Sequence, residues 1–288
     1  MKKSHAGLLL AFVFIARGTS FLFSKELMKS MSPMNILAIR FLLAFTVLSV
    51  IFNKRFHSFG KSSFKGGLIL GVLYTVCMAL EMYGLRLIDS GTCSLIENMA
   101  IIIVPLYVAA LTRIPPKKKT ILCALIAVAG VGFLSLSQSK TEGNALGITL
   151  TILAAFTYAA CILATEKVSK NGDPVAIGII QLGIMGLLSL LIAVPTGGLT
   201  FLTTSNQWLL MLILVLICSC FGFAFQPVGQ KYISAEAAAI LTVLNPLTAS
   251  IMGIAVAGEE INASKIIGYI LIIASLLIYN IKFKNKID

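Results

Sequence analysis

Charged residues are scarce in this chain of 288 residues, where Asp, Glu, Lys and Arg together make up 12%. Soluble domains carry about 25% charged residues, so this sequence has too few of them to cover the surface of a water-soluble globule. Hydrophobic residues make up 58% of the chain, and the mean hydropathy is +0.97. The composition excludes an ordinary soluble domain and predicts an all-α polytopic membrane protein.

Residues that bind metals or act as catalysts are also rare. The two histidines, His5 and His57, lie at helix ends or in a loop, and none of the six cysteines has metal-ligand spacing with them. The apolar segments contain no HExxH motif, no phosphate-binding Walker loop and no paired Asp motif. We therefore expect no metal site, no cofactor and no enzymatic activity.

Acidic residues are outnumbered by basic ones, and the formal net charge is +12. The basic residues form short clusters between apolar runs, which argues for contact with lipid headgroups and against a nucleic-acid partner. If both termini are inside, 16 of the 23 Lys and Arg residues lie in inner segments and 5 lie in outer loops. Because cytoplasmic loops carry an excess of Lys and Arg, we expect a multi-pass protein of a bacterial plasma membrane with both termini in the cytoplasm.

Apolar segments of membrane length divide the chain into ten predicted transmembrane helices. The breaks between them are short and rich in Gly, Pro, Asn and Asp, as expected for turns. The predicted spans are 5–28, 33–52, 65–86, 90–112, 119–137, 144–166, 174–194, 207–230, 235–257 and 264–282.

The two halves of the chain resemble each other. An apolar run begins at Ala235, and a similar run begins 145 positions earlier, at Ser90. Near the start of the halves, a shift of 141 positions places Tyr158 opposite Arg17. Since each half contains five spans, an odd number, the second half must be inverted relative to the first. The predicted domains are two inverted five-helix repeats, residues 5–137 and 144–282.

Several short motifs lie along the chain, two in the first half and two in the second. They are Pro33 with Arg40-Phe41-Leu42, Pro105 with Gly130-Val131-Gly132, Asn245-Pro246, and Gly258-Glu259. In this order and spacing they resemble the EamA type of the drug/metabolite transporter superfamily, over nearly the whole chain. The resemblance implies a central cavity, alternating access, and secondary-active transport of a small metabolite, commonly outward export of amino acids and related compounds. We expect a monomer or homodimer in the lipid bilayer.

The sequence departs from this family at two places. Arg17-Gly18 stands where the family usually has Trp-Gly, and Thr112-Arg113 replaces a Gly-Glu pair. The first change puts a charge near the expected cavity, so the substrate does not follow from the resemblance. An uptake carrier of the same fold is the main alternative, because inverted repeats have no inherent direction. A channel or an intramembrane enzyme would need filter or catalytic motifs that the sequence does not contain.

Four ionisable residues lie at similar depth inside the predicted spans: Arg17, Arg40, Glu81 and Glu97. Charges at membrane depth are rare and usually functional. One interpretation is a buried ion network that neutralises Arg40, Glu81 and Glu97. The other is that the two glutamates couple transport to protons or cations and that Arg17 grips a substrate carboxylate. The residues alone are compatible with both.

Helical spacing adds polar and aromatic side chains to the expected cavity lining. Asn98 and Asn245 are prominent among them, because an amide at membrane depth must find a partner. The predicted substrate-binding residues are Arg17, Tyr74, Met78, Glu81, Asn98, Tyr158, Gln226, Asn245 and Thr248, and the predicted coupling or ion network is Arg40, Glu81 and Glu97.

Overall fold

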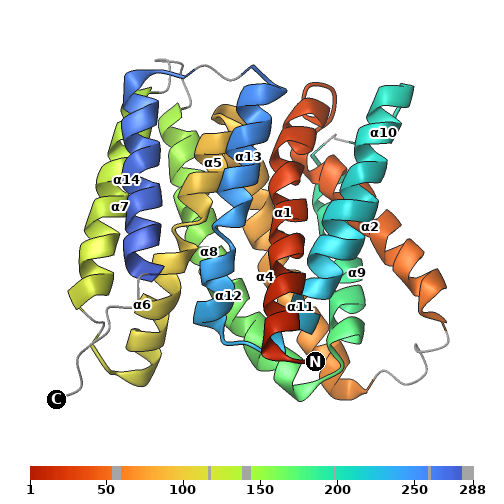
Figure 1. The fold of residues 1–288 in the computed structure, drawn as a ribbon. Coiled ribbons are helices and arrows are strands. Elements are labelled where there is room, and N and C mark those ends of the chain that lie inside the picture. Colours follow the sequence, from red (N-terminus) through yellow and green to blue (C-terminus); the bar gives the residue numbers. More distant parts are fainter. Residues whose placement is uncertain (54–59, 116–117, 138–143, 197–198, 259–260, 281–288) are drawn as a thin grey trace.

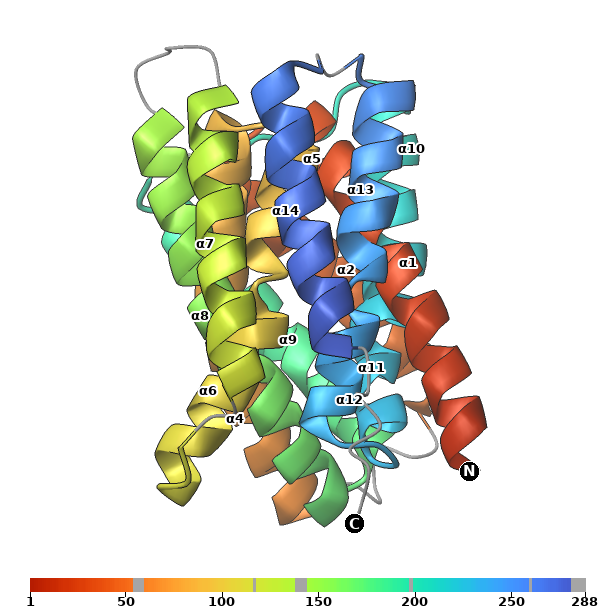
Figure 2. The same ribbon diagram turned by 60° about the vertical axis from the view of Figure 1, so that its left-hand side comes forward.

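The computed structural model describes residues 1–53, 60–115, 118–137, 144–196, 199–258 and 261–280. All regular structure in these residues is helical, and the helices form one bundle (Figures 1 and 2). The predicted all-α class is therefore confirmed. The elements are α1 (Lys3–Leu27), α2 (Pro33–Ile51), α4 (Lys61–Leu87), α5 (Ser90–Glu97), α6 (Ala100–Thr112), α7 (Lys118–Ser137), α8 (Asn144–Asn171), α9 (Pro174–Ala193), α10 (Ser205–Ile213), η1 (Leu214–Phe223), α11 (Ala224–Gln230), α12 (Ala235–Leu241), α13 (Leu244–Ala255) and α14 (Ala263–Asn280).

Eight of the ten predicted spans are long and apolar enough to cross a membrane in the described part of the chain. The other two fall on α7 and α14, where the described apolar stretches are shorter, Ile121–Val131 and Ala263–Ser275. These two helices pack against each other at one side of the bundle (Figures 1 and 2). Length and composition thus establish a multi-pass membrane protein with eight candidate spans.

The start of α1 and the end of α14 lie at the same end of the bundle, the lower end in Figure 1. The opposite end is referred to below as the upper end. Some predicted features lie outside the described residues: His57, Glu259 of the Gly258-Glu259 motif, and Lys54, Arg55, Lys117, Lys140, Lys282, Lys284 and Lys286 of the charge comparison.

Two helices that pack against each other, α2 and α9, begin in the same way. The Ser32 hydroxyl accepts a hydrogen bond from the Asn35 N–H at 3.4 Å, and Pro33 is the first residue of α2. Asp173 caps α9 in the same manner, and Pro174 follows it. A polar cap satisfies a free N–H of the first turn, and proline fits there because it has no N–H. Both helices therefore start sharply at a predicted break.

Two predicted spans are each broken into two helices. The first break, between α5 and α6, falls at Asn98 and Met99, and the second, between α12 and α13, falls at Thr242 and Val243. At both breaks a backbone N–H bonds to the carbonyl three residues back instead of four. Pro246 accounts for the second break, because a proline ring clashes with the carbonyl four residues earlier, that of Thr242.

The predicted span 207–230 is a continuous helix in three parts, α10, η1 and α11. The middle part, η1, is a π-helix of 10 residues, and such segments occur frequently at functional sites. The π-helix ends at Phe223, which lies four residues before Pro227. The ring of Pro227 would clash with the Phe223 carbonyl in a regular α-helix. The π-helix packs against α1 and α2 and positions the side chains described next.

The central helices approach one another closely. α4 packs against α8, and α1 packs against η1 and α11. A Cβ added at Gly84 of α4 would lie 2.4 Å from the Thr151 hydroxyl oxygen, and one added at Gly229 of α11 would lie 2.4 Å from Leu10 Cγ. An added methyl group would clash at both positions, so these glycines allow α4 to lie close to α8 and α11 to lie close to α1.

Candidate functional site

Arg17 of α1 is held by groups from three other helices. Its side chain is 4% exposed, and its Nη1 atom donates hydrogen bonds to the Tyr158 hydroxyl at 3.1 Å and to Gln226 Oε1 at 2.7 Å. The guanidinium carbon lies 4.2 Å from the centre of the Phe223 ring and 5.7 Å from that of Tyr74. Aromatic rings within about 6 Å attract a cation, so Arg17 sits in an aromatic cage.

Polar contacts continue from this cage toward the lower end. Gln226 donates to Gln230 Oε1 at 3.0 Å, and Gln230 donates to the Ile162 carbonyl at 3.3 Å. The Asn245 side chain of α13 lies near the Tyr158 hydroxyl. The cage thus joins α1, α8, α11 and α13 through side chains.

Arg40 of α2 is completely buried. Its Nε atom donates to the Ser219 hydroxyl of η1 at 2.7 Å. Its two terminal nitrogens, Nη1 and Nη2, have no hydrogen-bond partner among the described residues. The guanidinium carbon lies 5.1 Å from the ring centre of Phe41 and 5.7 Å from that of Phe223. Phe223 therefore contacts both arginines.

Glu81 of α4 and Glu97 of α5 form a buried carboxyl pair. They are 3% and 1% exposed, and their side chains are within hydrogen-bonding distance of each other. Both are near enough to Arg17 to interact with it electrostatically. In the described part of the chain, however, no carboxyl oxygen lies within 4.0 Å of Arg17 or Arg40. The ion network considered from the sequence is therefore one of neighbours and not of direct Arg–Glu pairs.

The other predicted lining residues lie on the central helices but differ in their contacts. Met78 is buried on α4. Asn98 Nδ2 donates to the Ser94 carbonyl at 2.8 Å, and the Oδ1 atoms of Asn98 and Asn245 have no partner among the described residues. Thr248 is half-buried, and its hydroxyl donates to the Leu244 carbonyl of its own helix at 2.8 Å. The role predicted for Thr248 in substrate binding stays a prediction.

Sequence reasoning missed the contribution of the π-helix. Phe223 contacts both arginines, Ser219 bonds Arg40, and a Cβ added at Gly222 would lie 2.9 Å from Arg17 Cγ. The wider π turn presents all three toward α1 and α2. Pro227, four residues after Phe223, was the available signal, since it marks a disturbed helix but not the type of disturbance.

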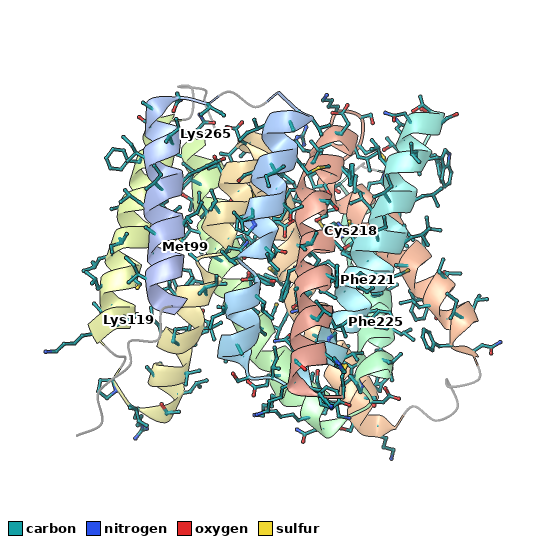
Figure 3. All side chains as sticks on the ribbon, in the orientation of Figure 1. Met99, Lys119, Cys218, Phe221, Phe225 and Lys265 are labelled. Carbon is teal, nitrogen blue, oxygen red and sulfur yellow. The ribbon has the colours of Figure 1, made fainter. Side chains whose placement is uncertain are left out.

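Lysines close the upper end of the site around Asp89. Lys25 of α1 donates to the Ile88 carbonyl at 3.0 Å and lies 3.9 Å from Asp89 Oδ1. Lys265 of α14, with a side chain 3% exposed, donates to Asp89 Oδ2 at 2.8 Å. Figure 3 shows Lys265 at the upper end of α14. These contacts, named here the upper latch, tie α1 and α14 to the start of α5.

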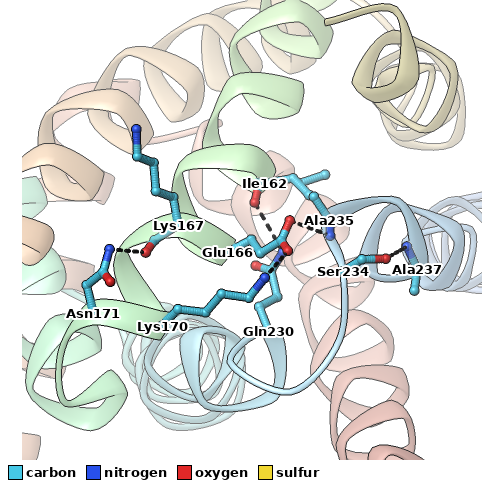
Figure 4. A network of polar contacts seen from close by, with 9 residues as sticks. All are labelled: Ile162, Glu166, Lys167, Lys170, Asn171, Gln230, Ser234, Ala235 and Ala237. Carbon is cyan, nitrogen blue, oxygen red and sulfur yellow. Dashed lines mark hydrogen bonds and ion pairs between the residues drawn. The ribbon is translucent and has the colours of Figure 1, made fainter. Parts of the chain in front are cut away.

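A matching set of contacts closes the lower end (Figure 4). The Glu166 carboxylate of α8 accepts a hydrogen bond from the Ala235 N–H of α12 at 2.8 Å, and its other oxygen pairs with Lys170. Ser234 caps the same helix by accepting from the Ala237 N–H at 3.3 Å. The bond from α12 to Glu166, named here the lower latch, ties the end of α8 to the start of α12.

A model of the EamA-like transporter family matches residues 5–136 and 145–281. The chain belongs to this family. Two uncharacterized transporters of Archaeoglobus fulgidus are similar, one 25% identical over 174 residues (60% of this chain, 62% of the relative) and one 24% identical over 287 residues (98% and 88%). The uncharacterized transporter YwfM of Bacillus subtilis is 24% identical over 191 residues (65% and 63%). The first and third matches span less than two thirds of those relatives.

The fold of this EamA-like chain occurs in a solved crystal structure that aligns with a TM-score of 0.71 over 97% of both chains, at 14% identity. Family and relatives indicate a membrane transporter rather than an enzyme, which confirms the resemblance deduced from the motifs. Among the described residues, no three His, Cys, Asp or Glu side chains are grouped so that they could hold a metal ion.

Proposed function

We propose that this EamA-like chain is a secondary-active transporter that exports a small metabolite, an amino acid or a related compound, by alternating access. It crosses the plasma membrane ten times as two inverted five-helix repeats, residues 5–137 and 144–282, with both termini in the cytoplasm. The observation that carries the proposal is the match between buried contacts of the two halves. The lower end of the bundle is then cytoplasmic and the upper end external.

Arg17 and Tyr158 are counterparts in the two halves, and they bond to each other. They are 141 residues apart, which is the offset that aligns the starts of the halves. Two residues that occupy equivalent positions in symmetry-related halves can contact each other only near the two-fold axis. Their bond supports an axis in the membrane plane that passes between α1 and α8, the arrangement of inverted repeats with a site at their interface.

A second match involves the glycine contacts at the centre. Gly84 and Gly229 are 145 residues apart, which is also the offset between the apolar runs that begin at Ser90 and Ala235. Their contact residues, Thr151 and Leu10, are 141 residues apart, the offset found for the first helices. The contact between α4 and α8 is therefore repeated, with the halves exchanged, between α11 and α1.

The upper and lower latches, at opposite ends of the bundle, are related by the same two sequence offsets. Lys25 and Glu166 are 141 residues apart, and the helices that they hold begin at Ser90 and Ala235, 145 residues apart. We assign the upper latch to the external gate and the lower latch to the cytoplasmic gate. In this proposal the structure represents a state with both gates closed and the site occluded. The breaks after α5 and α12 supply pivots, because discontinuous helices line the sites of many transporters.

Glu81 and Glu97 are the proposed coupling pair. Two carboxylates in contact within a low-dielectric interior repel each other strongly unless they share a proton. Release of that proton would leave adjacent negative charges and favour a rearrangement of α4 and α5. Proton movement through this pair would then drive export of the solute.

Counterflow in liposomes tests the transport function. Purified protein is reconstituted with an internal pool of amino acids and related compounds, and uptake of each labelled compound is followed with and without a pH gradient. Saturable exchange that responds to the gradient is expected, and voltage-driven unitary currents would instead identify a channel. Inside-out and right-side-out vesicles separate export from uptake. Tags on the two termini that appear on opposite membrane faces would overturn the ten-span arrangement.

A further inference from the structure

Arg40 carries a buried positive charge with unused hydrogen-bonding capacity. A guanidinium has five N–H donors in a planar fork. Ser219 engages Nε at 2.7 Å, while Nη1 and Nη2 have no partner among the described residues, and the side chain is 0% exposed. Leaving a buried charged group unpaired is costly, so a group in this position is expected to acquire a partner during the protein's working cycle.

We propose that Arg40 is the subsite for the carboxylate of the transported solute, and that the solute is a small organic acid or amino acid carrying one carboxylate. The two terminal nitrogens would bind the two carboxylate oxygens as a fork, which is the pairing that arginine favours. This assignment rests on the proposed transport function, because a solute reaches a completely buried guanidinium only when one end of the bundle opens.

The contacts favour Arg40 over Arg17, the arginine suggested by the sequence. Arg17 already donates to Tyr158 and Gln226 through Nη1, and its guanidinium lies 4.2 Å from the Phe223 ring centre. A solute at Arg17 would have to displace these contacts. At Arg40 the bond to Ser219 uses Nε alone and leaves the outer edge of the fork available.

The charges of the region favour a solute with one carboxylate group over a dianion. Arg17 and Arg40 contribute two positive charges, and the contact between Glu81 and Glu97 is compatible with a single negative charge when the pair shares a proton. The region then has an excess of one positive charge inside the membrane. A small monocarboxylic acid neutralises it, a zwitterionic amino acid leaves the net charge unchanged while its carboxylate pairs with Arg40, and a phosphate dianion would reverse its sign. The rings of Phe41 and Phe223 next to Arg40 suit the organic part of such a solute.

The test uses acids and their uncharged-headgroup analogues as matched probes. The melting temperature of the full-length protein in detergent is measured against L-leucine and L-leucinamide, L-lactate and lactamide, and benzoate and benzamide, with inorganic phosphate as a further anion. We expect at least one acid to stabilise the protein and its amide to have no effect. Hydrogen bonds to charged groups contribute about 1.5–3 kcal/mol, so Arg40→Lys, which keeps the charge but not the fork, should weaken acid binding about ten- to hundredfold.

Arg86→Lys is the matched control, because Arg86 lies on α4 with an exposed side chain, and this variant should bind acids like the wild type. If Arg40→Lys does not fold, Ser219→Ala replaces it, and it should weaken acid binding severalfold by releasing Nε. The assignment is overturned if amides bind as well as acids, if phosphate alone binds, if no acid binds, or if Arg40→Lys keeps wild-type affinity. In any of these cases, saturable counterflow of neutral or cationic solutes in liposomes would still support the transport function. If no solute shows counterflow, the proposed transport function fails together with the Arg40 assignment.

Discussion

Glu166→Gln should open the cytoplasmic side of the transporter, because Glu166 supplies the interhelical bond of the lower latch. Its carboxylate accepts the Ala235 N–H at 2.8 Å and thereby connects the end of α8 to the start of α12. Glutamine has nearly the same size and can still accept this bond, but it has lost the charge. The substitution therefore weakens the latch without creating a cavity.

The expected size of the effect follows from the bond. A hydrogen bond to a charged group contributes about 1.5–3 kcal/mol and a neutral one about 0.5–1.5 kcal/mol. The ion pair with Lys170 does not count, because both residues belong to α8 and remain together when the latch opens. The Glu166 side chain is 21% exposed, so solvent screens part of the difference. We expect a loss of about 1 kcal/mol, which changes the ratio of open to closed molecules about fivefold.

A buried cysteine reports the opening. Thr165 is fully buried one residue before Glu166 on α8, and Thr165→Cys is introduced into a background in which the six native cysteines are replaced by alanine. A membrane-impermeant maleimide is then applied to inside-out vesicles. When opening is rare and fast, the labelling rate follows the open population. Glu166→Gln should therefore raise the rate about fivefold.

Two further variants make the experiment decisive. Lys25→Gln weakens the upper latch, so it should favour external opening and leave the Thr165→Cys reporter no more reactive than before. Glu26→Gln removes an exposed neighbour of Lys25 that pairs locally with Lys29, and it should change neither end. An unchanged labelling rate in Glu166→Gln, or an equal increase in Lys25→Gln, would refute the assignment of the two latches to opposite gates.

Three other substitutions test the core of the site. Glu81→Gln or Glu97→Gln should abolish gradient-driven transport while expression stays measurable, and wild-type flux in both variants would remove the coupling role. Arg17→Lys should lower the melting temperature and reduce transport of acidic and neutral solutes equally, because lysine cannot reproduce the guanidinium contacts. A selective loss of transport for acids would instead identify Arg17 as the residue that binds the carboxylate. Gly84→Ala should destabilise the bundle by about 1–3 kcal/mol through overpacking, measured by thermal unfolding against Gly7→Ala, where an added Cβ has nothing within 4 Å.

Much of the architecture was predictable, because apolar length and turn residues decide where a membrane helix starts and stops. Pro33 and Pro174 begin α2 and α9 at the predicted breaks. Depth counting likewise placed Arg17 and Glu97 in one layer, and the structure brings them into one buried region. The partners were less predictable, because a residue's depth does not specify which way its side chain points around the helix.

Backbone irregularity was the larger gap. A proline in the sequence predicts a departure from regular α-helical geometry, but not its type: Pro227 accompanies a π-helix and Pro246 accompanies a helix break. The proline alone specifies neither of the two, and the helices packed around both sites come from distant parts of the chain. Ser219 and Phe223 reach the arginines only through the π-helix, so periodicity calculated for an ordinary α-helix could not select them.

The two repeats are similar in their contacts but not in their charges, and this difference bears on how a solute is held. All four ionisable residues of the site belong to the first repeat, while the second contributes the neutral partners Tyr158, Ser219, Phe223, Gln226 and Asn245. A symmetric site would bind a solute equally well in two opposite orientations. If Arg40 binds the carboxylate as proposed, a site with its charge on one repeat would hold the solute in one orientation only, with its organic part toward the second repeat. In the proposed cycle, the two latches would act on opposite ends independently, and the solute would keep its contact with Arg40 from binding until release.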